Sequence, residues 1–192
     1  MAKSIKGSRT EQNLLKAFAG ESQARNRYTF FASQARKEGF EQVAAIFEET
    51  GRNEQEHAKV FFKHLEGGDL EITASYPAGS IKDTKANLAA AASGEKMEWG
   101  TIYPEFAKIA RDEGYAEAAR SFEQVAKAEA FHEGRYAKLL ANIEKGEAFK
   151  KPAAVKWHCI NCGYVSEGTE PPKVCPACQH PQSFYEVLAA NY

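Results

Sequence analysis

The sequence predicts a mainly α protein, in which a four-helix bundle is followed by a small C-terminal metal-binding module. From residue 8 to about residue 143 the chain is rich in Ala, Glu, Gln, Lys, Arg and Phe, and its apolar residues recur at alternating steps of three and four. All four cysteines lie in the last 34 residues, as two C-x-x-C pairs. We therefore expect a bundle over residues 1–148, and a linker with a cysteine module over residues 149–192.

The overall charge argues against two classes of partner. The formal net charge is -1, so the 192-residue chain has no excess of positive charge for binding nucleic acid or anionic lipids. The stretch "MAKSIKGSRT" lacks the apolar region of a secretory signal, and the run "LAAAA" is far too short to cross a membrane. We expect a cytoplasmic protein without a nucleic-acid or membrane partner.

Four helices are expected near residues 9–38, 40–66, 82–113 and 115–145. Ser8 followed by Glu11 is a capping-box pattern for the first helix, and glycines mark the helix ends. The connection "GGDLEITASYPAGS" between the second and third helices is longer than the others. It is long enough to cross the bundle instead of making a tight turn.

An internal repeat relates the two halves of the bundle. "ARKEGF" and "ARDEGY" lie 75 positions apart. The same spacing relates Tyr28 to Tyr103, Glu54 to Glu129 and His57 to His132. Glu21 and Glu95 are only 74 positions apart, so the third helix has one extra residue between positions 95 and 103. A single insertion of this kind is usually absorbed as a π-bulge, which we predict there.

Ionisable residues interrupt the apolar stripe of every helix. They are Glu21, Glu54, His57, Glu95, Glu98, Glu129 and His132. An unpaired buried carboxylate costs several kcal/mol, so five converging carboxylates require a cation. Two E-x-x-H pairs, with one glutamate from each remaining helix, are the pattern of a dinuclear carboxylate site. Two divalent ions would nearly neutralise the charge of the five glutamates. Iron or manganese suits these ligands, whereas zinc would be redox-silent.

Simpler interpretations hold for single residues. One glutamate or histidine on a helix seam is more often partly exposed or salt-bridged. Arg25 could pair with one carboxylate, but it cannot satisfy five. Tyr28 and Tyr103 lie two turns from Glu21 and Glu95. They are either ordinary core residues or hydrogen-bond donors to the metal ligands or to bound oxygen species.

The cysteines form the pattern C-x2-C-x12-C-x2-C, within "CINCGYV" and "CPAC". They are Cys159, Cys162, Cys175 and Cys178. Each C-x-x-C makes a tight knuckle that presents two sulfurs to one ion, so we expect a tetrahedral four-thiolate site. Spacing alone does not choose between zinc and a redox-active iron, and it makes zinc the safer choice.

Taken together, these motifs resemble the rubrerythrin family along essentially the whole chain. The stretches "AGESQARNRY", "EQEHAK", "SGEKMEW", "AEAFHE" and "CINCGYV" carry the resemblance. It implies a ferritin-like di-iron bundle joined to a rubredoxin-like domain, with three irons per chain. It also implies a peroxidase that reduces hydrogen peroxide to water, with electrons from NADH arriving through a reductase or rubredoxin.

The resemblance also implies roles for individual residues. Glu21, Glu54, Glu98 and Glu129 would hold one iron, and Glu54, Glu95, Glu129 and His132 would hold the other. On reduction, the first iron would exchange Glu98 for His57. Peroxide would react with the reduced iron pair, and the cysteine-bound iron would then re-reduce it. Glu98, His57, Tyr28 and Tyr103 are the residues expected to act in catalysis. A head-to-tail homodimer would bring the cysteine-bound iron of one subunit near the iron pair of the other.

Two other functions compete with the peroxidase. A ferroxidase would use O2 to oxidise Fe(II), but such an enzyme takes its electrons from the substrate iron and has no need of an attached electron-transfer module. An iron-storage protein or a redox sensor is the non-enzymatic alternative. No obvious cage-forming extension or basic DNA-binding patch is found in the sequence.

Overall fold

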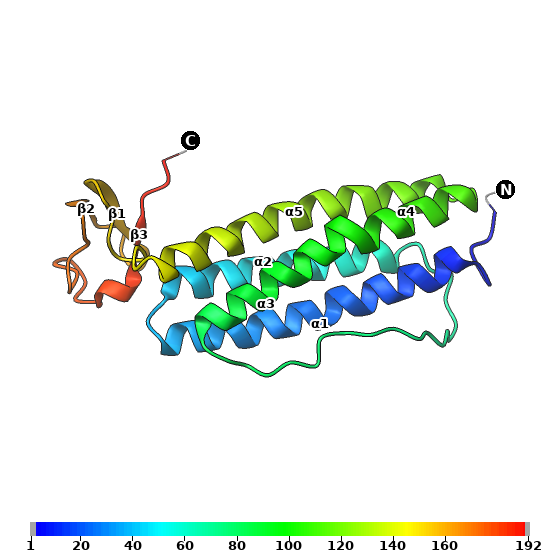
Figure 1. Ribbon diagram of the computed structural model, residues 1–192, viewed down its shortest axis with the longest axis horizontal. Helices are drawn as coiled ribbons and strands as arrows, with labels where there is room; N and C mark the ends of the chain where they lie inside the picture. The colour runs from blue at the N-terminus through cyan, green and yellow to red at the C-terminus, as the bar shows by residue number, and fades with distance from the viewer. Residues whose placement is uncertain (1–2, 191–192) are drawn as a thin grey trace.

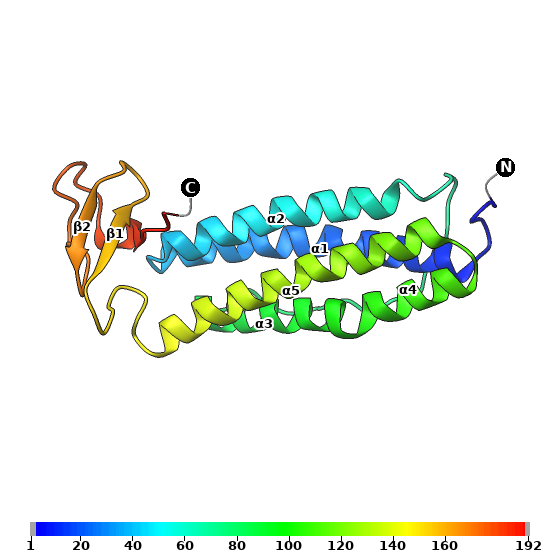
Figure 2. The same cartoon turned by 90° about the horizontal axis from the view of Figure 1, so that it is seen from above.

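Long helices run side by side along the molecule in the computed structural model, which describes residues 3–190 (Figure 1). They are α1 (Arg9–Lys37), α2 (Glu41–Phe62), α3 (Thr84–Met97), α4 (Tyr103–Asp112) and α5 (Ala116–Glu144). α3 and α4 follow one another along a single rod, so the bundle has four rods, as predicted (Figure 2). The second rod ends at Phe62, four residues earlier than expected.

The ends of α1 follow the local sequence. Ser8 Oγ accepts a hydrogen bond from the backbone N–H of Glu11 at 3.0 Å, and the Glu11 carboxylate accepts one from the backbone N–H of Gly7 at 2.8 Å. Gly39 has a φ of +80°, a conformation that ends a helix and that other residues rarely adopt. The N-cap at Ser8 and the glycine stop are confirmed, whereas the return bond to Glu11 comes from Gly7 and not from the N-cap residue, as a strict capping box would have it.

A π-helical segment, η1 (Glu98–Ile102), joins α3 to α4. The predicted π-bulge between residues 95 and 103 is therefore confirmed. One extra residue in a regular α-helix would turn everything after it by about 100°. The wider π turn absorbs the insertion, and Tyr103 consequently points into the core, where it is 1% exposed. The bulge lies beside the predicted ligands.

The connection between α2 and α3 runs back along the full length of the bundle, next to α1 (Figure 1). The predicted crossing is confirmed. The hydroxyl of Tyr76 in this connection donates a hydrogen bond to the backbone carbonyl of Lys16 on α1, at 2.7 Å. The connection therefore covers one side of α1, and α2 runs parallel to the α3–α4 rod (Figures 1 and 2).

Two apolar clusters fill the bundle. One is built around Phe47, Leu88 and Tyr136, and the other around Phe61 and Phe122, and all five side chains are fully buried. Neither cluster contains a glutamate or a histidine. The apolar cores thus surround a separate polar region, which is the candidate site.

The C-terminal module is a small antiparallel sheet at one end of the bundle (Figure 2). Its strands are β1 (Val155–Cys159), β2 (Val165–Gly168) and β3 (Tyr185–Val187), in the order β2-β1-β3, with a 3-10 turn, η2 (Gln182–Phe184), before β3. Phe149 stacks on Phe40 at the start of α2, with ring centroids 6.1 Å apart. The module therefore packs against the turn between α1 and α2.

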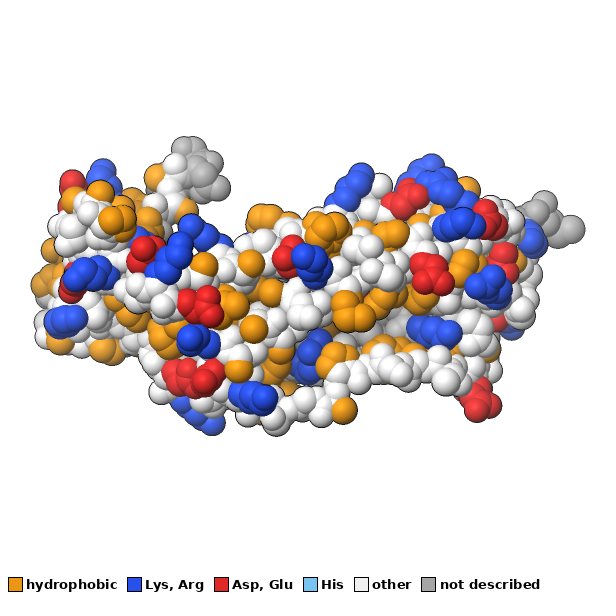
Figure 3. Space-filling model, viewed as in Figure 1, with side chains coloured by type: hydrophobic (Ala, Val, Ile, Leu, Met, Phe, Trp, Pro, Cys, Tyr) orange, Lys and Arg blue, Asp and Glu red, His pale blue; other side chains and the backbone are white. Residues whose placement is uncertain are grey.

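The surface charge and the apolarity of the helices concern two classes of partner, nucleic acids and membranes. Lys and Arg side chains are interspersed with Asp and Glu on the face shown in Figure 3, without a large area of one sign. Within residues 3–190, none of the helices combines the length and the apolarity that crossing a membrane requires.

Candidate functional site

The predicted ligands of the bundle lie near the middle of their helices and point inward. The ones with side chains at most 3% exposed are Glu21, Glu54, Glu95, Glu129 and His132. They come from α1, α2, α3 and α5, so all four rods contribute to the site. The two E-x-x-H pairs place their side chains on one helix face, because residues three apart in an α-helix are neighbours.

Ligand atoms of these residues form two overlapping groups. One consists of Glu21, Glu54, His57 and Glu129, and the other of Glu54, Glu95, Glu129 and His132. Within each group the ligand atoms all lie within 4.8 Å of one another. Glu54 and Glu129 belong to both groups. This is the geometry of two adjacent metal positions that share two carboxylates.

Both imidazoles face the shared carboxylates through Nδ1. His57 Nδ1 lies 2.7 Å from Oε1 of Glu129 and 2.9 Å from Oε2 of Glu54. His132 Nδ1 lies 2.8 Å from Oε2 of Glu129 and 3.2 Å from Oε1 of Glu54. The two rings are 5.7 Å apart and nearly parallel. Each position is therefore offered one imidazole nitrogen.

Glu98 lies outside both groups. Its side chain instead lines a cavity of about 500 Å³ between α1, η1 and the long connection. The resemblance implied that Glu98 would be a ligand of the position beside Glu21, with His57 replacing it on reduction. In this structure His57 belongs to the group that contains Glu21, and Glu98 does not.

Two buried tyrosines contact the outer carboxylates. The hydroxyl of Tyr28 donates a hydrogen bond to Oε1 of Glu95, and that of Tyr103 donates one to Oε1 of Glu21. Burial, followed by the charge of the adjacent carboxylate, raises the pKa of each tyrosine well above its ordinary value. Of the two interpretations left open by the sequence, hydrogen bonding to the ligand carboxylates is confirmed.

The electrostatics of the apo cluster are those of crowded carboxylates. Burial, together with neighbouring carboxylates, raises the pKa of Glu21 well above its usual range and that of Glu95 to about 8. Burial also acts to raise the pKa of Glu54, but His132 and His57 outweigh it and lower that pKa to about 2. Burial opposes protonation of His57, yet the adjacent carboxylates of Glu129 and Glu54, which stabilise the protonated ring, raise its pKa to about 10.

Several buried polar atoms of the cluster have no hydrogen-bond partner within residues 3–190. They are Glu21 Oε2, Glu54 Oε1, Glu95 Oε2, Glu129 Oε1 and Oε2, and His132 Nδ1. The close approaches of the two imidazoles to Glu129 and to Glu54 Oε1 are ion-pair contacts that are not aligned as hydrogen bonds. Buried polar atoms without a hydrogen-bond partner cost free energy unless a ligand binds them. Here these atoms lie together at one place in the bundle. The residues therefore fit a pair of metal ions, and mixed carboxylate and imidazole ligation suits iron.

Two arginines of α1 differ from the sequence-based expectation. Arg25, which the sequence offered as a partner for one of the inward carboxylates, is exposed, and its neighbour Ala24 is buried. Arg27, which the sequence analysis did not single out, lines the cavity that holds Glu98. Its spacing of six residues from Glu21 does not match an inward stripe, so the pattern carried no signal for it.

The four cysteines also converge. Their sulfurs all lie within 4.8 Å of one another, with Cys159 Sγ 3.8 Å from Cys178 Sγ and Cys162 Sγ 3.7 Å from Cys175 Sγ. A tetrahedral ion with metal–sulfur bonds of about 2.3 Å requires sulfurs about 3.8 Å apart. The described sulfurs therefore already match a single bound ion. Backbone hydrogen bonding at His180 lowers the pKa of Cys178 to about 6. The backbone N–H of Tyr164 acts to lower the pKa of Cys162, but the neighbouring thiols outweigh it and raise that pKa to about 12.

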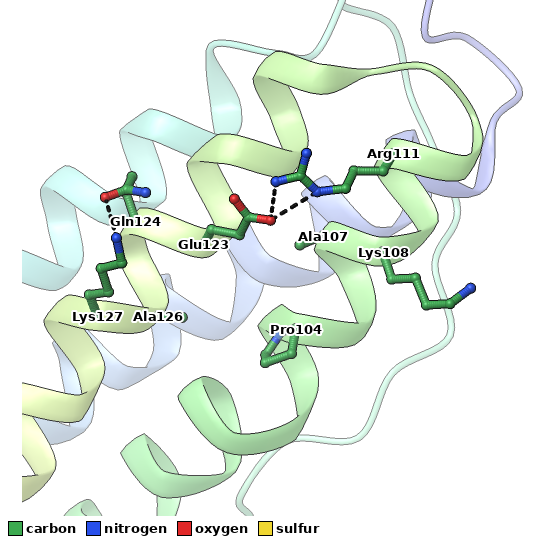
Figure 4. Close-up of a pocket in the computed structure, with 8 residues that line it drawn as sticks. All are labelled: Pro104, Ala107, Lys108, Arg111, Glu123, Gln124, Ala126 and Lys127. Atoms are coloured by element: carbon green, nitrogen blue, oxygen red, sulfur yellow. Dashed lines mark hydrogen bonds and ion pairs between the residues drawn. The ribbon is translucent and has the colours of Figure 1, made fainter.

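A separate surface cavity of about 470 Å³ lies between α4 and α5 (Figure 4). Arg111 reaches across it to Glu123, with Nε 3.0 Å from the carboxylate (Figure 4). None of the residues that line it belongs to either metal cluster. This cavity is therefore not part of the candidate site.

Comparisons with known proteins agree with both metal clusters. The profile of the family described as Rubrerythrin matches residues 12–140, and that of the rubrerythrin rubredoxin-like domain matches residues 157–186. A rubrerythrin of Porphyromonas gingivalis is 58% identical over 192 residues, covering 100% of this chain and 96% of that protein. One of Nitratidesulfovibrio vulgaris is 58% identical over 190 residues, covering 99% of this chain and 100% of that protein.

A solved structure gives the same result for the fold. The fully reduced, all-ferrous state of nigerythrin has a TM-score of 0.64 and 30% sequence identity, and covers 97% of this chain and 94% of that one. The chain therefore belongs to the rubrerythrin family, with a di-iron site in its ferritin-like bundle and a single four-cysteine iron site in its rubredoxin-like domain.

Proposed function

We propose that this protein is a peroxidase that reduces hydrogen peroxide to water. The observation that carries the proposal is the presence of a dinuclear ligand set and a four-thiolate site on one chain. Reducing one peroxide to two waters consumes two electrons and two protons, so the site needs a supply of electrons. The four-thiolate iron is a route by which electrons can be supplied. A ferroxidase has no need of such a route, because it draws electrons from the iron that it oxidises.

The chain's own residues hold the site in shape for this reaction. When bound, the two irons supply the electron pair that cleaves the O–O bond. Tyr28 and Tyr103 hold the outer carboxylates in fixed orientations through buried hydrogen bonds. Because burial and the adjacent carboxylates raise the pKa of both tyrosines, their hydroxyls stay protonated and remain donors at neutral pH.

We propose further that Glu98 and His57 exchange as ligands of the metal position beside Glu21. A neutral imidazole favours the ferrous state and an anionic carboxylate favours the ferric state. The arrangement with His57 inward and Glu98 outward corresponds to the reduced form in this scheme. Each redox cycle would then move two side chains of the chain itself.

Electrons would reach the site from a second subunit. The cysteine module packs at Phe40, and Glu54 lies fourteen residues further along α2, which is about 21 Å of helix. Electron transfer slows exponentially with distance, so a head-to-tail homodimer offers a shorter route than the single chain. The donor to the module would be rubredoxin or an NADH-dependent reductase, in a reducing compartment such as the cytoplasm.

The decisive experiment compares oxidants. The purified protein is reduced anaerobically, its iron is counted, and its reoxidation by stoichiometric peroxide and by O2 is followed by absorbance. We expect three irons per chain and much faster reoxidation by peroxide. Faster reaction with O2 would favour the ferroxidase, and zinc at the cysteines would remove the electron-entry step.

The ligand exchange is tested with His57→Ala. This variant should keep its fold and lose most steady-state peroxidase turnover, because the reduced state lacks its preferred ligand. His64→Ala is the matched control, since His64 contacts Ser121 at 2.8 Å and belongs to neither cluster. Unchanged turnover in His57→Ala would remove the exchange from the mechanism.

The dimer is tested by complementation. Glu129→Ala should abolish activity in the bundle, and Cys159→Ser should abolish electron entry through the module. Mixed dimers of the two variants contain one intact bundle and one intact module, on different chains. Recovery of activity on mixing supports transfer between subunits, whereas no recovery despite mixed dimers means that transfer occurs within one chain.

A further inference from the structure

Glu98 occupies a defined place outside the metal clusters. One carboxylate oxygen, Oε1, lies 3.9 Å from the position that a Cβ on Gly20 would take, and the ring of Tyr76 lies 3.6 Å from the same position. The glutamate is partly buried in a cavity that the long connection covers. A charged carboxylate in a partly buried place needs a cation nearby.

Arg27 is a cation at this cavity. It lines the same cavity as Glu98. Its Nη2 lies 3.7 Å from the position of a Cβ on Gly94, which is one helical turn before Glu98. Its Nε is buried and has no hydrogen-bond partner among the described residues. Arg27 thus has an unused donor at the cavity that Glu98 also lines.

Both residues break the internal repeat. Arg27 corresponds to Ile102 at the spacing of 75 residues, so the other half of the bundle has an apolar side chain there. Glu98 lies in the stretch that contains the extra residue, and it starts the π-helical segment. The two halves of the bundle therefore differ by an added carboxylate on one helix and an added cation on the helix that faces it.

We propose that Arg27 is a positioning residue that holds the displaced Glu98 carboxylate in this cavity, and this proposal rests on the exchange of Glu98 and His57 proposed above. A charged group stabilised outside the cluster shifts the exchange toward the arrangement in which His57 is the ligand. Arg27 would then favour the reduced state of the iron pair without touching it.

The test uses Arg27→Gln, with Arg27→Lys as the conservative variant and Arg25→Gln as the control. Arg25 is exposed on the same helix, so its replacement makes an equal change in net charge away from the cavity. Crystal structures of the zinc-loaded proteins, in which the metal stays divalent, report the position of Glu98. Redox titration of the iron-loaded proteins reports the midpoint potential, and thermal unfolding reports stability.

In wild-type protein and in Arg25→Gln, Glu98 should lie in the cavity when the metal is divalent. In Arg27→Gln the ratio of cavity to metal-bound Glu98 should fall about tenfold, the potential should become more negative, and Arg27→Lys should recover much of both changes. The proposal is overturned if Glu98 stays in the cavity of Arg27→Gln at an unchanged potential. Crystals of iron-loaded wild-type protein, before and after reduction, test the exchange separately: if Glu98 keeps one position in both, the exchange itself fails, so the two failures are distinguishable.

Discussion

Tyr28 on α1 donates its hydroxyl hydrogen to Glu95 on α3, and its repeat partner Tyr103 on α4 makes the same bond to Glu21 on α1. Each half of the repeated bundle therefore orients an outer carboxylate of the other half. The bonds cross between helices that are far apart in the sequence, so they form only when the two halves dock. Docking of the halves and shaping of the metal site are the same event.

The first prediction concerns this bond. Tyr28→Phe removes the donor to Glu95 and frees that carboxylate to rotate. Groups that orient metal ligands typically contribute about 10- to 100-fold to metal affinity, so Zn(II) affinity at this position should fall by that factor. Competition titration with a chromophoric chelator measures it.

Tyr136→Phe is the matched control for Tyr28→Phe. Tyr136 is fully buried, its ring centroid lies 5.4 Å from that of Tyr28, and its hydroxyl has no hydrogen-bond partner in the part of the chain described here. Losing this hydroxyl should leave metal affinity nearly unchanged. An equal loss in both variants would mean that the effect comes from packing and not from the bond to Glu95.

The second prediction concerns stability and pH. Glu113, at the end of α4, accepts hydrogen bonds from the backbone N–H groups of Arg9 at 3.2 Å and Thr10 at 2.9 Å, where α1 begins. Burial acts to raise the pKa of Glu113, but these bonds outweigh it and lower the pKa in the folded state. The stabilisation is therefore complete above the unfolded pKa of about 4.3 and is lost as the pH falls through the folded value.

Glu113→Gln keeps an acceptor oxygen and removes only the charge, so it should lower the free energy of unfolding by about 0.3 to 1 kcal/mol at pH 7, the usual contribution of a negative charge at a helix N-terminus. The difference from wild type should shrink as the pH approaches 3, because the wild-type carboxyl is then protonated as well. Asp112→Asn is the control, since Asp112 is 63% exposed and pairs only with Lys108 among the described ion pairs. Urea unfolding at several pH values measures the free energy of unfolding of each protein. A difference between wild type and Glu113→Gln that persists at pH 3 contradicts the prediction.

The third prediction concerns the extra residue of η1. Gly100 is exposed, and a Cβ there would have no atom within 4 Å among the described residues. Deleting Gly100 should convert η1 into regular α-helix and leave the register of α4 unchanged, because the π turn had absorbed that residue. Tyr103 should therefore keep its bond to Glu21, while Glu98 should leave its cavity.

Gly100→Ala is the control for the deletion. It keeps the chain length and should keep the π turn, with helix stability raised by up to about 1 kcal/mol. Crystal structures of both zinc-loaded variants provide the measurement. Loss of the bond between Tyr103 and Glu21 after the deletion would show that the insertion is not confined to η1.

The fourth prediction concerns metal removal from the C-terminal module. Its buried core consists of Trp157, Cys159, Cys175 and Tyr185, so two of four core residues are metal ligands. Its three strands have five, four and three residues, too little to fold without the ion. Chelation, or Cys159→Ser, should therefore unfold the module and leave the bundle helices intact.

Fluorescence separates the module from the bundle. The chain has two tryptophans, so in a Trp99→Phe background Trp157 becomes the only one. Its emission should shift to longer wavelength when the ion is removed, because Trp157 is fully buried in the folded module. An unshifted emission, with helical circular dichroism also unchanged, would mean that the module folds without metal.

Much of this site could be read from spacing along the chain. His57 and His132 follow their glutamates by three residues, and the 74-residue offset of Glu21 and Glu95 located the π segment within a few residues. The helix end at Phe62 and the outward direction of Arg25 were not predicted correctly. At both places the periodic pattern is weak: the chain leaves α2 through a turn after Phe62, and Arg25 faces solvent.

The helical repeat and the C-x-x-C spacing were enough to identify which residues share a face and which can bind a metal, because helix and knuckle geometry depend on the local backbone alone. The position of Glu98, the bonds from Tyr28 and Tyr103, and the approach of Arg27 depended on how α1 packs against α3, η1 and α4. Side-chain rotamers in a crowded interior are chosen by neighbours from distant parts of the chain, and no spacing along one helix records those neighbours.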